Sequence, residues 1–348
     1  MAFRVNDKNS TGEIASIGLM RGIASAMVCF FHLSYGNERL LPDSSLVKMT
    51  GKWGWAGIQI FFIISGFVIP YSMYVKNYAV SNMGTFLKKR IIRIEPPYIV
   101  SIILVLVLGY VSTLMPFYRG GPFHIDWLNV AGHIAYINVF TGARWLQDVY
   151  WTLAIEFQYY ILIALAFGLV ASKKQYLRIL FFLLFTASLL LKPVLSSSFI
   201  FGFATYFILG ILLFQYYCRI STDTEFWSLL FITISVSYYF EGPLLTGLSV
   251  VTVCMIALIK KVHPVFAFLG AISYSLYLIH IPVGGRIINI TEAFIHSTHG
   301  KELMVFVAFA FCILAAYLYY LIIEKRFKIL SSKIGYRKNT QPSVAGSI

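Results

Sequence analysis

Charged residues are scarce in this chain: they make up 12% of its 348 residues, whereas 59% of the residues are hydrophobic and 17% are aromatic. The mean hydropathy is +0.77. A soluble globular domain carries roughly twice this share of charged residues on its surface. The composition therefore excludes a soluble domain as the main body of the protein. It predicts a chain that spends most of its length inside a membrane.

The motifs of several common enzyme classes are also absent. No cysteine pair has C-x-x-C spacing, and the seven histidines show no H-x-x-x-H or H-E-x-x-H pattern, so we expect no metal site. No P-loop and no G-x-S-x-G sequence occurs, so neither nucleotide hydrolysis nor a serine acyl-enzyme is indicated. The sequence contains no internal repeat and no second soluble domain.

Long apolar runs are abundant. A helix rises ~1.5 Å per residue, so about 20 apolar residues cross a hydrocarbon core ~30 Å thick. Breaking the chain at polar clusters predicts ten membrane helices, the seventh and eighth forming a short hairpin. We expect them at 14–35, 55–75, 97–115, 150–171, 176–191, 199–217, 226–240, 244–259, 266–285 and 303–323. The predicted fold is an all-α, polytopic membrane helix bundle.

The net charge of +14 follows membrane topology rather than a nucleic-acid surface, because the positive residues lie in the breaks between apolar runs. Nineteen of the 28 Lys and Arg residues fall on the side of the N-terminus and eight on the opposite side. The positive-inside rule then places both termini in the cytoplasm. We expect a cytoplasmic N-terminus over 1–13, a membrane domain over 14–330 and a disordered cytoplasmic tail over 331–348.

The first helix carries two ionisable side chains, Arg21 and His32, eleven residues apart. At ~100° per residue, eleven steps return to within about 20° of the starting direction and advance ~16 Å along the axis. Both side chains therefore share one face, with Arg21 in the inner half and His32 near the outer end. Ionisable groups inside membrane helices commonly mark a functional site. The alternatives are snorkelling of Arg21 to the headgroups and an interfacial His32 bonded to a neighbouring helix.

Two further titratable groups are expected at the depth of His32. Glu156 is about six residues into a helix that enters from outside, and His280 is about five residues from the outer end of a helix that runs outward. A histidine paired with a carboxylate is a common general base near neutral pH. The alternatives are a structural partner role for Glu156 and a structural hydrogen bond for His280.

A basic stretch precedes the predicted third helix. Arg90 and Arg93 are three residues apart and share a helical face, and their guanidinium forks suit phosphate oxygens. The plain alternatives are a topology signal or a contact with anionic lipid. Pro96 and Pro97 fit a helix start. The outward break 116–149 holds an apolar piece too short to span the membrane, which we expect to be interfacial or re-entrant.

Five motif blocks, in order, resemble the bacterial acyltransferase family three, integral membrane O-acyltransferases that act on cell-surface carbohydrates. The blocks are Arg21-x10-His32, Gly54-x-x-Gly57-Ile58-x-Ile60-Phe61-Phe62-x-x-Ser65-Gly66-Phe67, Phe86-x-x-x-Arg90-x-x-Arg93-Ile94-x-Pro96-x-Tyr98, Trp151-x-Leu153-x-x-Glu156-Phe157-x-x-Tyr160 and Ser273-Tyr274-Ser275-x-Tyr277-Leu278-x-His280. The resemblance extends from residue 14 to about 330. Some relatives append a soluble extracytoplasmic esterase-like domain, which we do not expect here.

The resemblance implies transfer of an acyl group, typically acetyl, from cytoplasmic acyl-CoA to a hydroxyl of a cell-surface polysaccharide or lipid-linked sugar at the bacterial cytoplasmic membrane. It implies His32 as the general base and Glu156 as the residue that orients its imidazole. Donor-binding residues would be Arg21, Arg90, Arg93, Ser65 and Tyr98, and acceptor-binding residues Trp145, Trp151, Tyr277 and His280. Stacking surface for a glycan would come from Phe117, Tyr118, Trp127, Tyr136 and Trp145. Direct transfer and a covalent acyl-histidine step both stay open, as does a homo-oligomer.

Two other functions fit ten helices with buried ionisable groups. One is a transporter or flippase of a polar lipid or glycan, although no inverted repeat and no matching pair of Gly/Pro-broken spans is found. The other is a non-catalytic membrane partner of a polysaccharide assembly complex. Conversion of acetyl-CoA to an acetyl ester on a glycan separates the enzyme from both.

Overall fold

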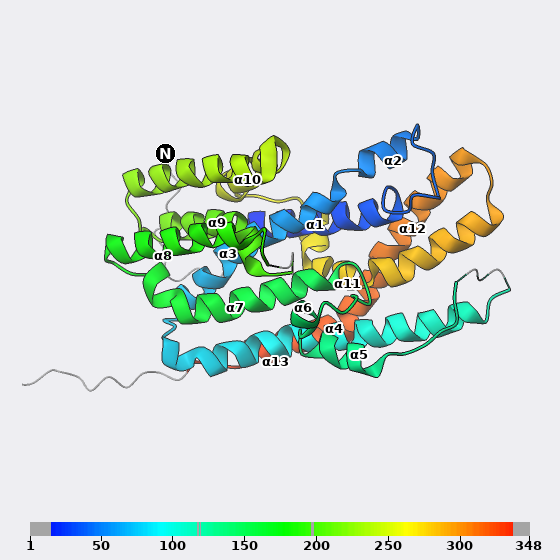
Figure 1. The fold of residues 1–348 in the computed structure, drawn as a ribbon, viewed down its shortest axis with the longest axis horizontal. Coiled ribbons are helices and arrows are strands. Elements are labelled where there is room, and N and C mark those ends of the chain that lie inside the picture. Colours follow the sequence, from blue (N-terminus) through cyan, green and yellow to red (C-terminus); the bar gives the residue numbers. More distant parts are fainter. Residues whose placement is uncertain (1–14, 117, 119, 196–197, 337–348) are drawn as a thin grey trace, which may run out of the picture.

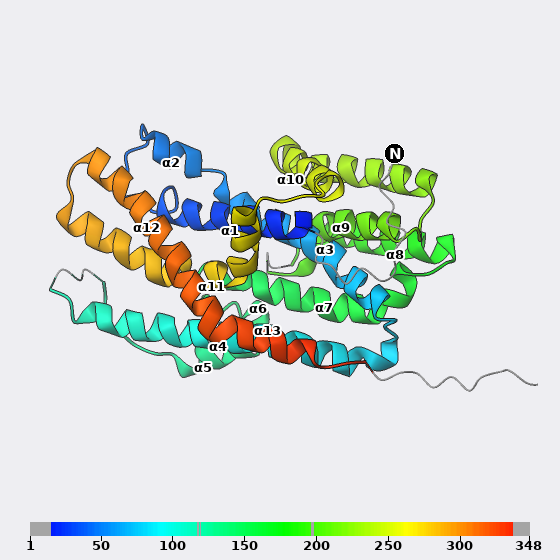
Figure 2. The ribbon, with the colours of Figure 1, turned by 180° about the vertical axis from the view of Figure 1, so that it is seen from behind.

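Long helices that lie roughly along one direction make up the structure (Figure 1). The computed structural model describes residues 15–116, 118, 120–195 and 198–336. Its helices are α1 (Ala15–Leu33), α2 (Leu46–Gly51), α3 (Gly57–Val75), α4 (Met83–Thr113), α5 (Trp127–Ile134), α6 (Asn138–Thr141), α7 (Tyr150–Val170), α8 (Gln175–Ala187), α9 (Ala204–Tyr217), α10 (Asp223–Leu258), α11 (Pro264–Phe294), α12 (Thr298–Tyr319) and α13 (Lys325–Ser332). A π turn, η5 (Tyr320–Glu324), joins α12 to α13, and α13 lies along α4 (Figure 2). These residues contain no strand, so the all-α prediction is confirmed.

The number of membrane passes agrees with the predicted ten. Eight helical stretches among the described residues are long and apolar enough to cross a membrane, and α8 with its following turn adds a shorter apolar helix. The stretch α10 consists of two arms, because the backbone leaves the helical region at Gly242 (φ 81°, ψ 176°). Ser237 Oγ and Thr246 Oγ1 lie 3.1 Å apart across this point, whereas nine residues of straight helix span about 13.5 Å. The arms therefore fold back on each other as the predicted hairpin.

The predicted start of the third helix is wrong. Helix α4 begins at Met83 rather than residue 97 and continues through Pro96 and Pro97. A proline lacks the N–H that a helix interior needs, which is why these residues predicted a boundary. A neighbouring helix contacts this stretch, where the Tyr274 hydroxyl of α11 donates to the Ile94 carbonyl at 2.9 Å. The basic stretch before the prolines is consequently helical.

The outward loop between α4 and α7 folds into two short helices, α5 and α6, neither of which is long enough to span a membrane. His133 anchors the loop: its Nδ1 lies 2.8 Å from the Asn129 carbonyl and its Nε2 accepts the Leu146 N–H at 2.9 Å. Burial lowers the pKa of His133 despite the backbone hydrogen bond to Asn129, so the ring is a neutral scaffold. Trp145 packs edge-on against it at 5.4 Å. Phe117 lies outside the described residues, as do 1–14 and 337–348.

Close backbone contact fixes α1 against α11. A Cβ atom at Gly270 would lie 2.2 Å from the Gly18 carbonyl oxygen, so this crossing admits only glycine at position 270. Further along the same pair, Arg21 contacts Ser273 and His32 contacts His280. Residue numbers rise together on both helices, so α1 and α11 run in parallel. This agrees with the prediction that both helices run outward.

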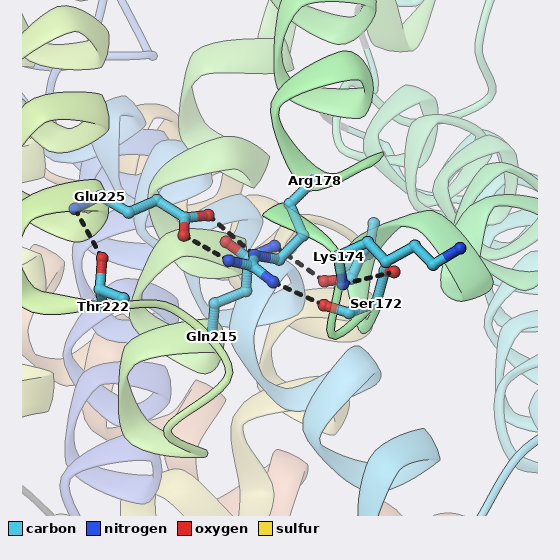
Figure 3. A network of polar contacts seen from close by, with 7 residues as sticks. Ser172, Lys174, Arg178, Gln215, Thr222 and Glu225 are labelled. Atoms are coloured by element: carbon cyan, nitrogen blue, oxygen red, sulfur yellow. Dashed lines mark hydrogen bonds and ion pairs between the residues drawn. The ribbon is translucent and has the colours of Figure 1, made fainter. Parts of the chain in front are cut away.

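A buried ion pair connects the ends of three helices (Figure 3). Arg178 of α8 donates through Nε to Glu225 Oε1 of α10 at 2.8 Å, and its second nitrogen donates to the other carboxylate oxygen. Its third nitrogen donates to the Ser172 carbonyl, beyond the end of α7, at 2.6 Å. The Thr222 hydroxyl caps α10 by accepting the Glu225 N–H. Each guanidinium nitrogen therefore has a protein partner.

Candidate active site

Helix α1 presents its two ionisable residues to α11. Arg21 Nε donates to Ser273 Oγ at 3.2 Å, and His32 Nδ1 lies 3.2 Å from His280 Nε2. Because both contacts are made with the same neighbouring helix, Arg21 and His32 lie on one face of α1. That is the geometry expected from their eleven-residue spacing.

The hydrogen bonds of the two histidines determine where their protons lie. His280 Nδ1 is 2.9 Å from the Leu276 carbonyl, which only accepts, so this nitrogen carries the proton and Nε2 is an acceptor. His32 Nδ1 is 2.9 Å from the Val28 carbonyl and also faces His280 Nε2, so it too carries a proton. The remaining nitrogen of His32, Nε2, then holds a free lone pair. A neutral imidazole in this tautomer can accept a proton from a substrate.

Two small cavities lie inward of the histidine pair. One, of about 70 Å³, is lined by Arg21, Ser65, Glu156 and Tyr277 among others, and Ser65 Oγ donates to Glu156 Oε1 at 2.9 Å. The other, of about 10 Å³, is lined by Arg90 and again by Glu156. Glu156 therefore stands between the two arginines. It interacts electrostatically with both of them.

Glu156 is not the partner of His32 in this arrangement. The hydrogen bonds of the described residues join Glu156 to Ser65, and His280 lies against the imidazole instead. Glu156 shares with Arg21 a cavity that lies inward of the histidine pair. The start of α7 is covered by other parts of the protein, since Val149 and Tyr150 are both 0% exposed. Residue counting gives depth only when a helix begins at the membrane surface.

The inner arginines have few protein partners. Arg90 donates to Ser72 Oγ at 3.2 Å, and its guanidinium lies over the rings of Phe86 and Tyr160 at 5.3 and 5.4 Å. Arg93 is partly buried and interacts electrostatically with the other two arginines. In the described part of the chain, none of the three forms an ion pair with a carboxylate. The cluster therefore retains positive charge and unused N–H donors.

An outer cavity of about 400 Å³ opens on the other side of the histidines. Its lining includes His32, Glu38, Arg39, Asp148 and Gly285. The exposed Asp148 carboxylate interacts electrostatically with His32. Neither Asp148 nor Arg39 was predicted as a site residue. The available signal was an acidic residue directly before the buried start of α7.

Tyr277 connects the inner cavity to the histidine pair. Its hydroxyl lies 2.7 Å from Thr152 Oγ1, and its ring is 6.1 Å from the His280 ring. His280 itself is 0% exposed, so it faces His32 and not a solvent-filled pocket. Of the four residues expected to bind the acceptor, His280 belongs to the histidine pair and Tyr277 lies beside it.

Three other predicted residues lie away from the cavities described above. Tyr98 stacks on Tyr136 at 5.8 Å within an aromatic cluster, and it is five residues beyond Arg93, which turns it ~140° around α4. Trp145 packs on the outward loop, and Trp151 packs on Phe203 at 5.6 Å. In these contacts the three side chains fill apolar space.

A buried carboxylate near the C-terminus also escaped the sequence analysis. Glu324, at the end of the π turn, accepts the N–H and the hydroxyl of Ser275 at 3.1 and 2.6 Å. It interacts electrostatically with Arg21. The available signal was a single acid directly after the last apolar run. Glu324 holds the stretch of α11 that contacts Arg21.

A family model described as "Acyltransferase domain" matches residues 14–324, nearly the whole chain. No curated protein and no solved structure matches the sequence. The matched stretch contains all five motif blocks and every cavity-lining residue discussed above.

Proposed function

We propose that this chain, which belongs to the acyltransferase family whose model it matches, transfers an acyl group from a cytoplasmic acyl-CoA to a sugar hydroxyl across the membrane. The family and the apolar helices make it a multi-pass membrane acyltransferase. The acetyl donor, the glycan acceptor and the bacterial inner membrane as its location are parts of the proposal.

One observation carries it: a continuous series of residues leads from the inner arginines to the outer cavity. The two inner cavities share Glu156, and the larger of them, of about 70 Å³, is also lined by Tyr277. The Tyr277 ring adjoins His280, which contacts His32, and His32 lines the outer cavity. A donor entering from the cytoplasm and an acceptor entering from outside would therefore meet at His32.

The inner end of this series suits a coenzyme. Arg90 and Arg93 would bind the CoA phosphates at the mouth, because their donors are largely unused and guanidinium forks match phosphate oxygens. Arg21 and Ser65 would contact the pantetheine arm further in. The cavities are narrow, which favours a thin linear arm over a nucleotide. The nucleotide would remain at the cytoplasmic mouth.

At the histidine pair, His32 Nε2 would take the proton of the acceptor hydroxyl as its oxygen attacks the thioester carbonyl carbon. The carbon–sulfur bond breaks, the acyl group remains on the oxygen as an ester, and the thiolate leaves. The imidazolium then returns its proton to the thiolate, giving free CoA thiol and neutral His32. His280 accepts from His32 Nδ1 and keeps the ring in the reactive tautomer.

The test measures acyl transfer in sealed inside-out membrane vesicles given labelled acetyl-CoA. We expect His32→Ala to lower formation of labelled acetyl ester about 10²- to 10⁴-fold, the usual contribution of a general base. His124→Ala is the matched control, since His124 is exposed on the outward loop. It should keep full activity.

Wild-type activity of His32→Ala at an equal membrane level would overturn the assignment of the base. Movement of a glycan or lipid without any acetyl-CoA requirement would support the transporter instead.

A further inference from the structure

A second outer cavity adjoins the one that contains His32. It has a volume of about 440 Å³ and lies between the outer ends of α4 and α11. Arg39 lines both cavities, and Gly285 of the first is followed in the chain by Arg286 of the second. The two cavities are therefore neighbours. A single molecule can occupy both.

The second cavity has a charged side and an apolar side. Arg39, Arg286 and Glu292 contribute its charges, which leaves one positive charge in excess. Arg286 Nε is buried and has no hydrogen-bond partner among the described residues. A buried N–H without a partner is costly, so this atom is poised for an acceptor from a ligand.

The apolar side faces the bilayer. Val111 of α4, Met115 just beyond the end of α4 and Ile290 of α11 line the cavity, and they are 39%, 40% and 47% exposed. On the outer part of membrane-spanning helices, such exposed apolar side chains contact lipid chains. The cavity thus offers guanidinium groups beside a path to the hydrocarbon core. That combination suits an anionic head on an apolar chain.

We propose that this cavity binds the phosphate or diphosphate of a lipid-linked saccharide, so that the acceptor is a sugar still attached to its lipid carrier. Arg286 and Arg39 bind the anion, the lipid chain leaves past Val111 and Ile290, and the sugar reaches the His32 cavity. Arg286 is six residues beyond His280 on α11, about 9 Å of helix rise. The inference rests on the proposed function for the identity of the sugar, but the anion site is tested without acyl transfer.

The experiment measures thermal unfolding of the detergent-solubilised protein with geranylgeranyl diphosphate as the probe. Geranylgeraniol, inorganic pyrophosphate and a phosphatidylglycerol serve as comparison ligands. We expect the diphosphate lipid to raise the unfolding temperature, whereas each comparison ligand does so weakly or not at all. Arg286→Gln should weaken diphosphate-lipid binding roughly 10- to 150-fold, because it removes a charge-assisted hydrogen bond. Arg144→Gln, an exposed loop variant, should bind as the wild type does.

Equal stabilisation by geranylgeraniol would make the cavity a plain lipid groove, and equal stabilisation by pyrophosphate would remove the lipid from the proposal. Equal stabilisation by phosphatidylglycerol would make it a general headgroup site. Unchanged binding of the diphosphate lipid by Arg286→Gln would overturn the proposal. If Arg286→Gln does not fold, Arg39→Gln is tested in its place. Because no acyl donor is present, failure here is distinct from failure of the His32 test.

Discussion

Two arginine sites inside this molecule differ in how fully their hydrogen bonds are used. Arg178 makes three close bonds, two of them to the carboxylate of Glu225, and the two side chains are 3% and 1% exposed. Figure 3 shows this pair enclosed by the ends of its helices. Within the described residues, Arg21 and Arg90 each donate one hydrogen bond, of 3.2 Å, to a neutral serine hydroxyl. The first site is complete as it stands, whereas the second has donors to spare.

This difference separates structural charge from functional charge. A buried guanidinium has lost its water, and that loss must be offset by hydrogen bonds or a counter-charge. At Arg178 the protein supplies both. At Arg21 and Arg90 it supplies little within bonding distance, so a phosphate or carbonyl oxygen of a ligand can complete the site. The comparison predicts that loss of Arg178 pairing affects folding and loss of Arg90 affects donor binding.

The largest expected effect is on stability, at Glu225. Glu225→Gln leaves the Arg178 charge buried and unpaired, which should lower the free energy of unfolding by about 3–5 kcal/mol. Thermal unfolding of the detergent-solubilised protein and its level in the membrane measure this loss. The double variant Arg178→Met/Glu225→Leu should recover most of the stability, since it removes both charges and fills the space.

If Glu225→Gln left the unfolding temperature unchanged and reduced acyl transfer instead, the division into structural and functional arginines would fail.

The next effect is on donor binding, at Arg90. Arg90→Gln should raise the KM for acetyl-CoA roughly 10- to 150-fold, because a charge-assisted hydrogen bond contributes about 1.5–3 kcal/mol. Its stability should fall by at most about 2 kcal/mol, the value of the ring contacts to Phe86 and Tyr160. Steady-state kinetics and thermal unfolding of the same preparation check both statements.

Arg90→Lys keeps the positive charge but loses the forked guanidinium. Its KM for acetyl-CoA should lie between those of the wild type and Arg90→Gln. The exposed Lys88→Gln should leave KM unchanged. A KM that is unaffected in Arg90→Gln would favour plain lipid contact or topology for this residue.

Much of the fold could be predicted from sequence, because hydrophobic runs and charge asymmetry act over whole helices. Even the hairpin at Gly242 was predictable from its glycine–proline pair. The start of α4 was not, because the helices that pack on this stretch are distant in the chain: Tyr274, which donates to the Ile94 carbonyl, is 180 residues away. Rules that consider only neighbouring residues place a helix boundary at a proline. They take no account of contacts with a helix that is distant in the chain.

The candidate site was predictable only within single helices. The shared face of Arg21 and His32 follows from helix geometry alone, and their contacts with α11 agree with it. The partner of Glu156 is Ser65 of α3, and which helix packs against α7 at this point does not follow from the sequence of α7. The pairing of His32 with His280 depends on the close crossing at Gly270. Relations between helices therefore need the structure.

The smallest expected effect is on kcat, at His280. Counted over the described residues, its side chain makes fewer hydrogen bonds than that of Arg178 and more than those of Arg21 and Arg90. His32 Nδ1 has two acceptors, the Val28 carbonyl and His280 Nε2, so removing one leaves the tautomer supported by the other. His280→Leu should therefore lower kcat only about 2- to 12-fold, equivalent to a neutral hydrogen bond of about 0.5–1.5 kcal/mol, with KM for acetyl-CoA unchanged. His280→Gln, whose amide oxygen can accept, should restore part of kcat. A kcat as low as that of His32→Ala would instead make His280 a participant in proton transfer, because loss of a redundant acceptor cannot have so large an effect.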